Sequence, residues 1–451
     1  MVGMLSSVEI RDLVGRGDLD TVWAVTPDQC GRPVGVRFAA RYFVDEVLDR
    51  QSDIAAGLLF RDVAGTHVPP PSTIRVDSTA VLALRPDGAT MRRAGWIDRT
   101  AIVLCDLIDP VSGEPHGFSP RAVLKRQLDR ARSASVAARG SCDVEFYLDA
   151  AGGSASVAGT SGARQRAAYD HQAVDADGGS DLVSHMQRAL RASGIPVRQS
   201  QPAAGPSQFA MALQAGTLLD AADRVMLAKW AVKEIARGAG RRATFMACAD
   251  DALPTSAMEI STSLVSADRE APLFAGKESA DLPVACGWWI GGLLRHARDA
   301  TLLFAPTVNS YKRYRADHGV GSIIGWARDR RSVGVRVEGD GARRLVACSL
   351  AGADANPYLA TAAVLAAGLD GLANRIEPAA EVGRDAGSVR GLPRVPLGIV
   401  EAADLASRST FLRQSVGEQY AEYLAHCARW EQARFEATVT SWEIGRYGDA
   451  V

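Results

Sequence analysis

Two carboxylates in the first third of the chain have a spacing that could do chemistry. The stretch Asp143-Val-Glu145-Phe-Tyr-Leu148 is typical of a β-strand, and alternation along a strand puts Asp143 and Glu145 on the same face. Paired carboxylates on one face can hold a hard cation such as Mg²⁺ or share a proton. An exposed, solvated strand face is the alternative, and the pattern alone does not decide between them.

A cationic group follows later in the chain. The stretch from 326 to 337 carries four arginines, namely Arg328, Arg330, Arg331 and Arg336. On one continuous strand, Arg331 and Arg336 would point to opposite faces unless a bulge or loop intervenes. The arginines therefore form either a convergent anion site or a solvated basic face, and the second interpretation is favoured from spacing alone.

A single carboxylate, Glu259, stands among small and hydroxyl residues in the stretch ALPTSAMEISTSL, residues 252–264. This stretch follows a predicted buried strand, Ala243–Ala249. A charge beside a buried strand is costly unless something pairs with it. Glu259 is therefore either an exposed turn residue or part of a polar site.

Other catalytic motifs are absent from the sequence. It has no phosphate-binding G-x-x-x-x-G-K-[ST] loop, no G-x-S-x-G elbow and no H-E-x-x-H pair. The glycines from Gly319 to Gly325 are spaced one residue too widely for a dinucleotide fingerprint. Isolated histidines such as His185 and His296 are expected to be core or surface residues.

Composition narrows the class of protein. The 451 residues, 47% hydrophobic and 23% charged, suit a globular protein of two or three domains. A formal net charge of -1 gives no electrostatic basis for nucleic acid or an anionic membrane as partner. Seven cysteines without a C-x-x-C pair favour buried thiols in a reducing compartment, and no apolar run reaches about 18 residues. The expected location is cytoplasmic.

The first part of the chain, to about residue 105, is expected to be a small α+β unit. A helix is predicted to open near Ser7 and another to run from Ala39 to Leu48. Strands are predicted at Thr21–Val25, Val81–Leu84 and Ala101–Leu104.

A larger unit follows. Ser119-Pro120 has the pattern of an N-cap and a first-turn proline, and opens a helix through Ala131. Residues 150–180, rich in Gly, Ala and Ser, are predicted to form a loop. Thr217 with Asp220 resembles a capping box at the start of a long helix, and the stretch from Ser409 to Tyr447 is predicted to be helical.

Several segments resemble the motifs of glutamine synthetases, in the order that this family has them. Asp143-Val-Glu145-Phe-Tyr is similar to the family's E-x-E-F-F strand, and Asn309-Ser-Tyr-Lys-Arg313 to its N-S-Y-K-R segment. The N-P-Y-L run matches Asn356–Leu359, the A-T-F-M strand matches Ala243–Met246, and the C-terminal W-E-x-x-R-Y matches Trp442–Tyr447. Residues 1 to about 108 are similar only in size and layout.

The resemblance implies an α+β protein with an N-terminal β-grasp domain, 1–108. It also implies a glutamine synthetase-type catalytic domain, 109–451, with an antiparallel sheet and helices. Members of the family join a carboxylate, usually the γ-carboxylate of glutamate, to ammonia or an amine. ATP phosphorylates the carboxylate, the amine displaces phosphate, and divalent cations neutralise the phosphate charge. The family also forms rings in which one subunit closes its neighbour's site.

The metal and nucleotide positions implied by the resemblance are partly kept. Asp143 and Glu145 keep the acidic pair of the E-x-E strand. Glu259 and Ser261 stand where the family has two histidines, so that Asp143, Glu145 and Glu259 are the implied metal ligands. Ser263, at the end of the same motif, is the implied nucleotide-binding residue.

The cationic positions are better kept. The resemblance assigns catalytic roles to Arg313, Arg331 and Arg336, and substrate binding to Arg313 and Asn309.

Other family positions are lost. The metal-binding glutamate of the G-Q-x-E motif falls on Ala210, and residues 201–204, where a further one is expected, hold no carboxylate. The E-x-R pair ahead of the N-P-Y run falls on Ala347 and Ser349, and the flap glutamate falls on Gly319. Alanine side chains offer Mg²⁺ no ligand, so at least one metal should be lost.

Three hypotheses remain for the function. The favoured one is a binding or regulatory pseudoenzyme with weak or absent family activity, in a homo-oligomeric ring or in a mixed ring with an active paralogue. The second is a divergent carbon–nitrogen ligase with one Mg²⁺ or Mn²⁺ and ATP. The third is a repurposed enzyme that acts on an amino acid or amide without ATP. A small amino acid or amine is the expected substrate, and the cofactor set is either one metal with ATP or none.

The lost metal ligands leave two expectations for Glu259. It completes a residual cation site, or it pairs with an arginine freed by the lost metals and closes the pocket.

Overall fold

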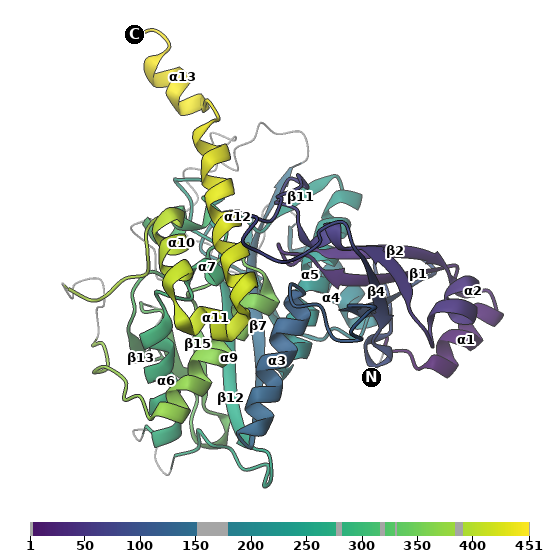
Figure 1. The fold of residues 1–451 in the computed structure, drawn as a ribbon, viewed down its shortest axis with the longest axis horizontal. Coiled ribbons are helices and arrows are strands. Elements are labelled where there is room, and N and C mark those ends of the chain that lie inside the picture. Colours follow the sequence, from purple (N-terminus) through teal and green to yellow (C-terminus); the bar gives the residue numbers. More distant parts are fainter. Residues whose placement is uncertain are drawn as a thin grey trace.

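A computed structural model describes residues 3–150, 179–276, 282–315, 321–329, 332–383 and 391–450 of the chain. Two β-sheets organise it, a six-stranded sheet near the N-terminus and a nine-stranded sheet in the larger part (Figure 1). The α+β expectation is confirmed. No helix in the described ranges is long and apolar enough to cross a membrane.

The smaller sheet has the strand order β2-β1-β6-β4-β3, with β5 paired to β6. Its central strands β1 and β6 run parallel, and the other pairs are antiparallel. A hairpin, a helical segment and a parallel last strand beside the first are the arrangement of a β-grasp sheet. The strands are β1 Thr21–Pro27, β2 Pro33–Ala39, β3 Ser52–Ala55, β4 Val81–Pro86, β5 Arg92–Arg93 and β6 Thr100–Ile108.

Short helices cover this sheet, and the predicted helical positions near Ser7 and Ala39–Leu48 are confirmed. Ser6 caps the first helix with a complete capping box, while the second ends in a π-helical turn. The helical segments are α1 Ser7–Gly15, α2 Ala40–Tyr42, the π-turn Phe43–Val47, and the 3₁₀ turns Ala56–Leu59 and Gly88–Thr90.

The larger sheet has the order β13-β14-β15-β12-β7-β9-β8, with β10 and β11 also paired to β7. Its pairs are antiparallel except for β13 and β14 at the edge. The strands are β7 Val136–Ala150, β8 Val197–Pro202, β9 Gln208–Leu213, β10 Gly216–Thr217, β11 Arg241–Thr244, β12 Met258–Ser266, β13 Trp326–Arg328, β14 Val335–Glu338 and β15 Leu345–Cys348.

One face of the larger sheet carries buried apolar side chains. Helices α3 and α5 pack on β7, and α9 packs against both of these helices (Figure 1). Cys142 and Val144 of β7 lie on this face, and the Cys142 sulfur lies 3.8 Å from the Thr361 hydroxyl of α9. Alternation then sends Asp143 and Glu145 to the opposite face, as the sequence predicts. The helices fix which face of the sheet remains for a site.

The helices begin at the predicted caps. Pro120 opens α3 after the cap Ser119, and Thr217 with Asp220 forms a complete capping box ahead of α5. The C-terminal helical stretch is confirmed, and its last part extends away from the body (Figure 1). The helices are α3 Pro120–Ser133, α4 Gly179–Ala192, α5 Leu218–Gly238, α6 Val284–His296, α7 Thr301–Phe304, α8 Ser310–Arg315, α9 Pro357–Asn374, α10 Ile399–Arg408, α11 Thr410–Val416, α12 Glu418–Glu436 and α13 Ser441–Tyr447.

One predicted strand is wrong in its length. The strand expected over Ala243–Ala249 is β11, which ends at Thr244. Beyond it the side-chain amide of Asn309 bonds Cys248, accepting from its N–H at 3.0 Å and donating to its carbonyl at 2.8 Å. Because a side chain satisfies this backbone, no strand partner is needed. Most of the loop predicted for 150–180 lies outside the described residues.

Arg121 joins the two sheets through a buried ionic network. Its guanidinium donates to Asp223 of α5 at 3.1 Å, to Asp106 of β6 at 2.7 Å and to Asp87 at 2.8 Å. Its side chain is fully buried, and Asp223 also accepts from the Tyr358 hydroxyl at 2.7 Å. The network therefore couples the smaller sheet to the helices of the larger unit.

Arg121→Ala should lower the free energy of unfolding by about 3–5 kcal/mol, because it leaves buried carboxylates without their cation. Denaturant unfolding of the full chain measures this. Arg132→Ala, at an exposed arginine of the same helix paired with exposed Asp129, is the matched control and should cost less than about 1 kcal/mol. Equal losses in the two variants would contradict a structural role for the network.

Candidate functional site

The candidate site is the polar face of the larger sheet. Asp143 of β7 and Glu259 of β12 are direct cross-strand partners, so their side chains project from this face together. Glu145 follows two residues after Asp143 on the same face. Glu259 thus belongs to a polar site and not to an exposed turn, and the three carboxylates expected to act together share one face.

Glu259 is paired with an arginine. Arg336 of β14 donates from Nη2 to Glu259 Oε1 at 2.8 Å, and the same guanidinium also bonds Glu338. The Arg336 side chain is only 4% exposed. Burial alone would lower the pKa of Arg336, but Glu259 and Glu338 outweigh it and raise that pKa. Of the two expectations for Glu259, pairing with an arginine describes the observed contact.

Asp143 is bonded to an arginine from the other side. Arg198 donates from Nη2 to Asp143 Oδ2 at 3.1 Å, from a point where a bulge shifts the register of β8 between Val197 and Gln199. Burial raises the pKa of Asp143 to about 7; Arg198 opposes this shift and Glu259 adds to it. Asp143 Oδ1 is buried and has no hydrogen-bond partner in the part of the chain that the structure describes.

Glu145 lies in a row that is poor in carboxylates. Its direct partner on β9 is Ala210, and the partner of Ala210 on β8 is Gln201. Glu145 Oε2 accepts from the Ala257 N–H at 2.8 Å. Ala210 is a place where the sequence predicts a lost metal ligand, and the strand register sets it directly beside Glu145. Residues 201–204, where the sequence predicts a further loss, begin at the next position of this row.

The donor set does not fit a site of two or three divalent cations. Within the described ranges, no group of three or more His, Cys, Asp or Glu side chains is arranged to hold a metal ion. Mg²⁺ requires near-octahedral oxygen ligands. Glu259 is already bonded to Arg336 and Asp143 to Arg198. Asp143 Oδ1, buried and without a hydrogen-bond partner among the described residues, is a carboxylate oxygen of this face that suits a single cation.

The other predicted site residues lie apart from the carboxylates or have different partners. Arg313 of α8 is buried and donates to the backbone carbonyls of Leu350 at 3.1 Å and Ser349 at 2.8 Å. Asn309, as described above, bonds the backbone of Cys248 through its amide. Ser263 lies on the sheet face of Glu259, four residues along β12 and opposite Arg139.

Two further positions singled out by the sequence, Arg331 and Gly319, lie outside the described residues. The roles assigned to Arg313, Arg331, Asn309 and Ser263 stay predictions. For Arg313 and Asn309, the structure adds a backbone-supporting role that the motif alone does not indicate.

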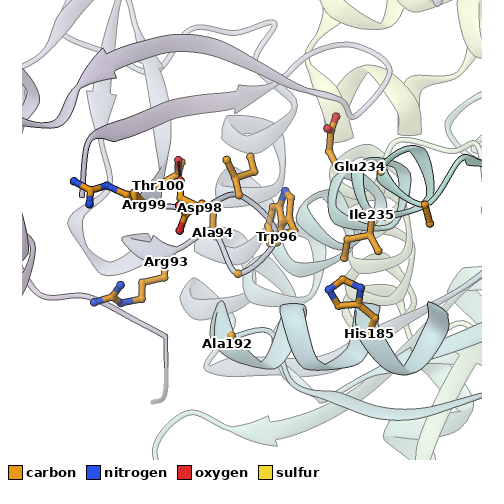
Figure 2. A pocket seen from close by; sticks show the side chains of 14 residues that line it. Arg93, Ala94, Trp96, Asp98, Arg99, Thr100, His185, Ala192, Glu234 and Ile235 are labelled. Atoms are coloured by element: carbon orange, nitrogen blue, oxygen red, sulfur yellow. Dashed lines mark hydrogen bonds between the residues drawn. The ribbon is translucent and has the colours of Figure 1, made fainter. Parts of the chain in front are cut away.

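A separate cavity of about 750 Å³ lies between the β5–β6 turn and helices α4 and α5. Figure 2 shows Trp96 close to Ile235 of α5 and His185 of α4 on its wall. The Trp96 indole N–H is buried and unpartnered within the described ranges. The Trp96 ring lies edge-on to the Trp230 ring, with the ring centroids 5.6 Å apart. Sequence reasoning missed this cavity because its wall comes from three elements without a motif, and it treated His185 as an ordinary helical residue.

Replacing Asp143 should change how stability depends on pH. With a folded-state pKa of about 7 against an ordinary value of 3.8, folded Asp143 keeps a proton that the unfolded chain releases above about pH 4. The stability from this proton is fully present below about pH 4 and is lost as the pH rises through 7. The free energy of unfolding of Asp143→Asn minus that of the unsubstituted chain should therefore increase from pH 5 to pH 8, by at most a few kcal/mol.

Unfolding of both proteins at the two pH values measures this gain. Asp129→Asn, at an exposed carboxylate of α3, is the control and should show no such gain. A stability difference between Asp143→Asn and the unsubstituted chain that is the same at both pH values would contradict a protonated Asp143.

Comparison with known proteins identifies the family. The family model for the glutamine synthetase catalytic domain matches residues 117–447. Gamma-glutamylethanolamide synthetase GlnA4 of Streptomyces coelicolor is 32% identical over 445 residues, covering 97% of this chain and 94% of that protein. Glutamate–isopropylamine ligase of a Pseudomonas species is 28% identical, covering 98% of both chains.

A solved structure titled "Apo GmaS without ligand" has the same fold, with a TM-score of 0.84 and 24% identity over 97% of this chain and 99% of that one. The order of the sequence motifs agrees with the family match, and the two-sheet fold agrees with the structural match. This chain is a member of the glutamine synthetase family.

Proposed function

We propose that this chain is a glutamine synthetase-family protein in which ATP-dependent γ-glutamyl amide formation is weak or absent. It serves instead as a binding or regulatory member of the family. The observation that carries the proposal is the row Gln201–Ala210–Glu145 across β8, β9 and β7. Glu145 is the one carboxylate of this row, where the family resemblance implies another at Ala210 and a further one within the adjoining residues 201–204.

A second loss supports the same conclusion. Ala347 of β15 lies between Ser261 of β12 and Arg336 of β14, where the resemblance implies a metal-binding glutamate. Loss of a single electrostatic stabiliser typically costs about 10²–10³ in rate. Several such losses on one phosphoryl-transfer path lower the rate far below that of an ordinary ligase.

The ligand class follows from the charge of the remaining face. Asp143 and Glu145 present carboxylate oxygens, which suit a primary ammonium group. Arg313, which would otherwise be available for a carboxylate, is bonded to the carbonyls of Ser349 and Leu350. A small amine or amino acid held through its ammonium group is therefore the proposed ligand.

The assembly and domain division belong to the same proposal. The smaller domain is 1–108 and the catalytic-type domain 109–451, with the division in the connection between the end of β6 at Ile108 and the start of α3 at Pro120. The chain works in a ring, either with copies of itself or with an active paralogue, and in the cytoplasm.

A second candidate is a ligase that uses one Mg²⁺ or Mn²⁺ with ATP. Two observations favour it. Asp143 Oδ1 is a buried oxygen without a hydrogen-bond partner among the described residues, and the relatives that match nearly the whole chain carry the names of amide-forming enzymes. In this case Asp143, Glu145 and Glu259 hold the ion, Ser263 contacts the nucleotide, and the arginines bind substrate and phosphate.

Phosphate and ADP release separates the two candidates. With ATP, Mg²⁺ or Mn²⁺, glutamate and a panel of amines that includes ammonia, ethanolamine and isopropylamine, the full chain should release no phosphate above background. The reason is that too few oxygen ligands remain to hold the divalent cations that neutralise the charge of the transferring phosphate. A glutamine synthetase of ordinary activity in the same assay is the positive control.

Turnover comparable to that of the control enzyme, abolished by Glu145→Ala, would overturn the proposal and establish the ligase. A separate measurement, of amine binding, tests the favoured function directly. Calorimetric titration with the same amines should show binding that Asp143→Asn weakens, while Asp129→Asn leaves it unchanged.

A further inference from the structure

Two carboxylates face each other across the site and need a counter-charge. Asp143 and Glu259 are directly opposite on adjacent strands, and like charges in such a pair destabilise a sheet. In the glutamine synthetase reaction divalent cations balance such carboxylates. In this chain an arginine lies on the outer side of each one: Arg336, at a position that the resemblance keeps, and Arg198, which lies outside the motifs of the resemblance.

The row of charges comes from four strands, β14, β12, β7 and β8, with β15 and β9 lying between them. Arg336 of β14 bonds Glu259, and Arg198 of β8 bonds Asp143, so the order of charges is positive, negative, negative, positive. Glu338 adds a second carboxylate to Arg336. Each inward carboxylate therefore has a guanidinium as direct partner.

Local features of β15 and β8 allow both arginine side chains to reach the carboxylates. Arg336 is separated from Glu259 by strand β15, and the residue of β15 opposite Arg336 is Ala347. A small side chain there leaves room for the guanidinium to cross the strand. On the other side, the bulge in β8 interrupts the ladder around Arg198.

We propose that Arg336 and Arg198 are built-in cations that take the place of divalent metal on this sheet face. Each arginine thereby supplies a positive charge to the carboxylate that it bonds without a metal ion, and the fold does not depend on one. This inference rests on the proposed loss of metal-dependent ligation, but it is tested by metal binding and stability and not by turnover. Guanidinium groups suit the role because they stay charged when buried and bond carboxylates in two directions.

The test compares the chelator-treated full chain with Arg336→Ala in titrations with Mn²⁺. The unsubstituted chain should give no binding heat assignable to this face, and its melting temperature should move by less than about 1 °C. Arg336→Ala should melt lower and should regain about 2 °C or more with millimolar Mn²⁺, because its carboxylates are then free to bind the ion. Adding Glu259→Gln should remove that gain.

Controls separate this effect from a general loss of structure. Arg336→Lys keeps a positive charge and should gain no Mn²⁺ response. Arg343→Ala removes an arginine that is 89% exposed on the neighbouring hairpin, and should melt and titrate like the unsubstituted chain. If Arg336→Ala fails to fold, Arg198→Ala provides the same test, since that side chain is 56% exposed and its removal leaves the core unchanged.

Two results would overturn the inference. One is Mn²⁺ binding by the unsubstituted chain that Asp143→Asn abolishes. The other is a folded Arg336→Ala or Arg198→Ala without any gain in Mn²⁺ response. Metal binding without phosphate release would overturn this inference and leave the proposed function standing, whereas phosphate release at the rate of an ordinary ligase would overturn the proposed function.

Discussion

The repulsion between Asp143 and Glu259 is the constraint on which the polar face depends. Two unit charges about 5 Å apart, at an effective dielectric constant of about 20, repel by about 3 kcal/mol. That energy is a large part of the net stability of an ordinary domain. A sheet with this pair at its centre therefore needs a proton, a metal or an arginine at the site. Here burial is the main cause of the raised pKa of Asp143 and Glu259 is a smaller one, while the two arginine contacts oppose the repulsion.

The apolar side of the sheet determines where these charges stand. Cys142 and Val144 are buried against the helices, so their neighbours Asp143 and Glu145 must face the other way. A register slip of one residue would bury the carboxylates and expose the apolar residues, which makes the observed register strongly preferred. The packing of Cys142 on Thr361 of α9 thus contributes to the geometry of a site on the opposite face.

Local sequence signals predicted much of the fold. The caps at Ser119 and Thr217 and the alternation at Asp143 and Glu145 act over a few residues, and the structure has them where the sequence places them. The contact between Glu259 and Arg336 was not predictable as such, because it depends on β14, β15 and β12 lying side by side. The bulge that brings Arg198 to Asp143 also has no local signal, and the predicted strand over Ala243–Ala249 was too long because a distant side chain, Asn309, bonds its second half.

Ala347 and Glu259, two positions where this sequence departs from the family pattern, both affect the contacts of Arg336. A glutamate at Ala347 would place a further carboxylate between Arg336 and Ser261, beside the guanidinium that crosses this strand to Glu259. A histidine in place of Glu259 would leave Arg336 with Glu338 alone and would remove one of the two facing charges. Neither change alone recreates a set of metal ligands, because Ala210 would still lack a carboxylate. Arg336 stands at a position that the resemblance keeps, so the arginine by itself does not exclude a metal; the missing carboxylates at Ala210 and Ala347 separate this face from the family pattern, and without them Arg336 is the cation that pairs with Glu259.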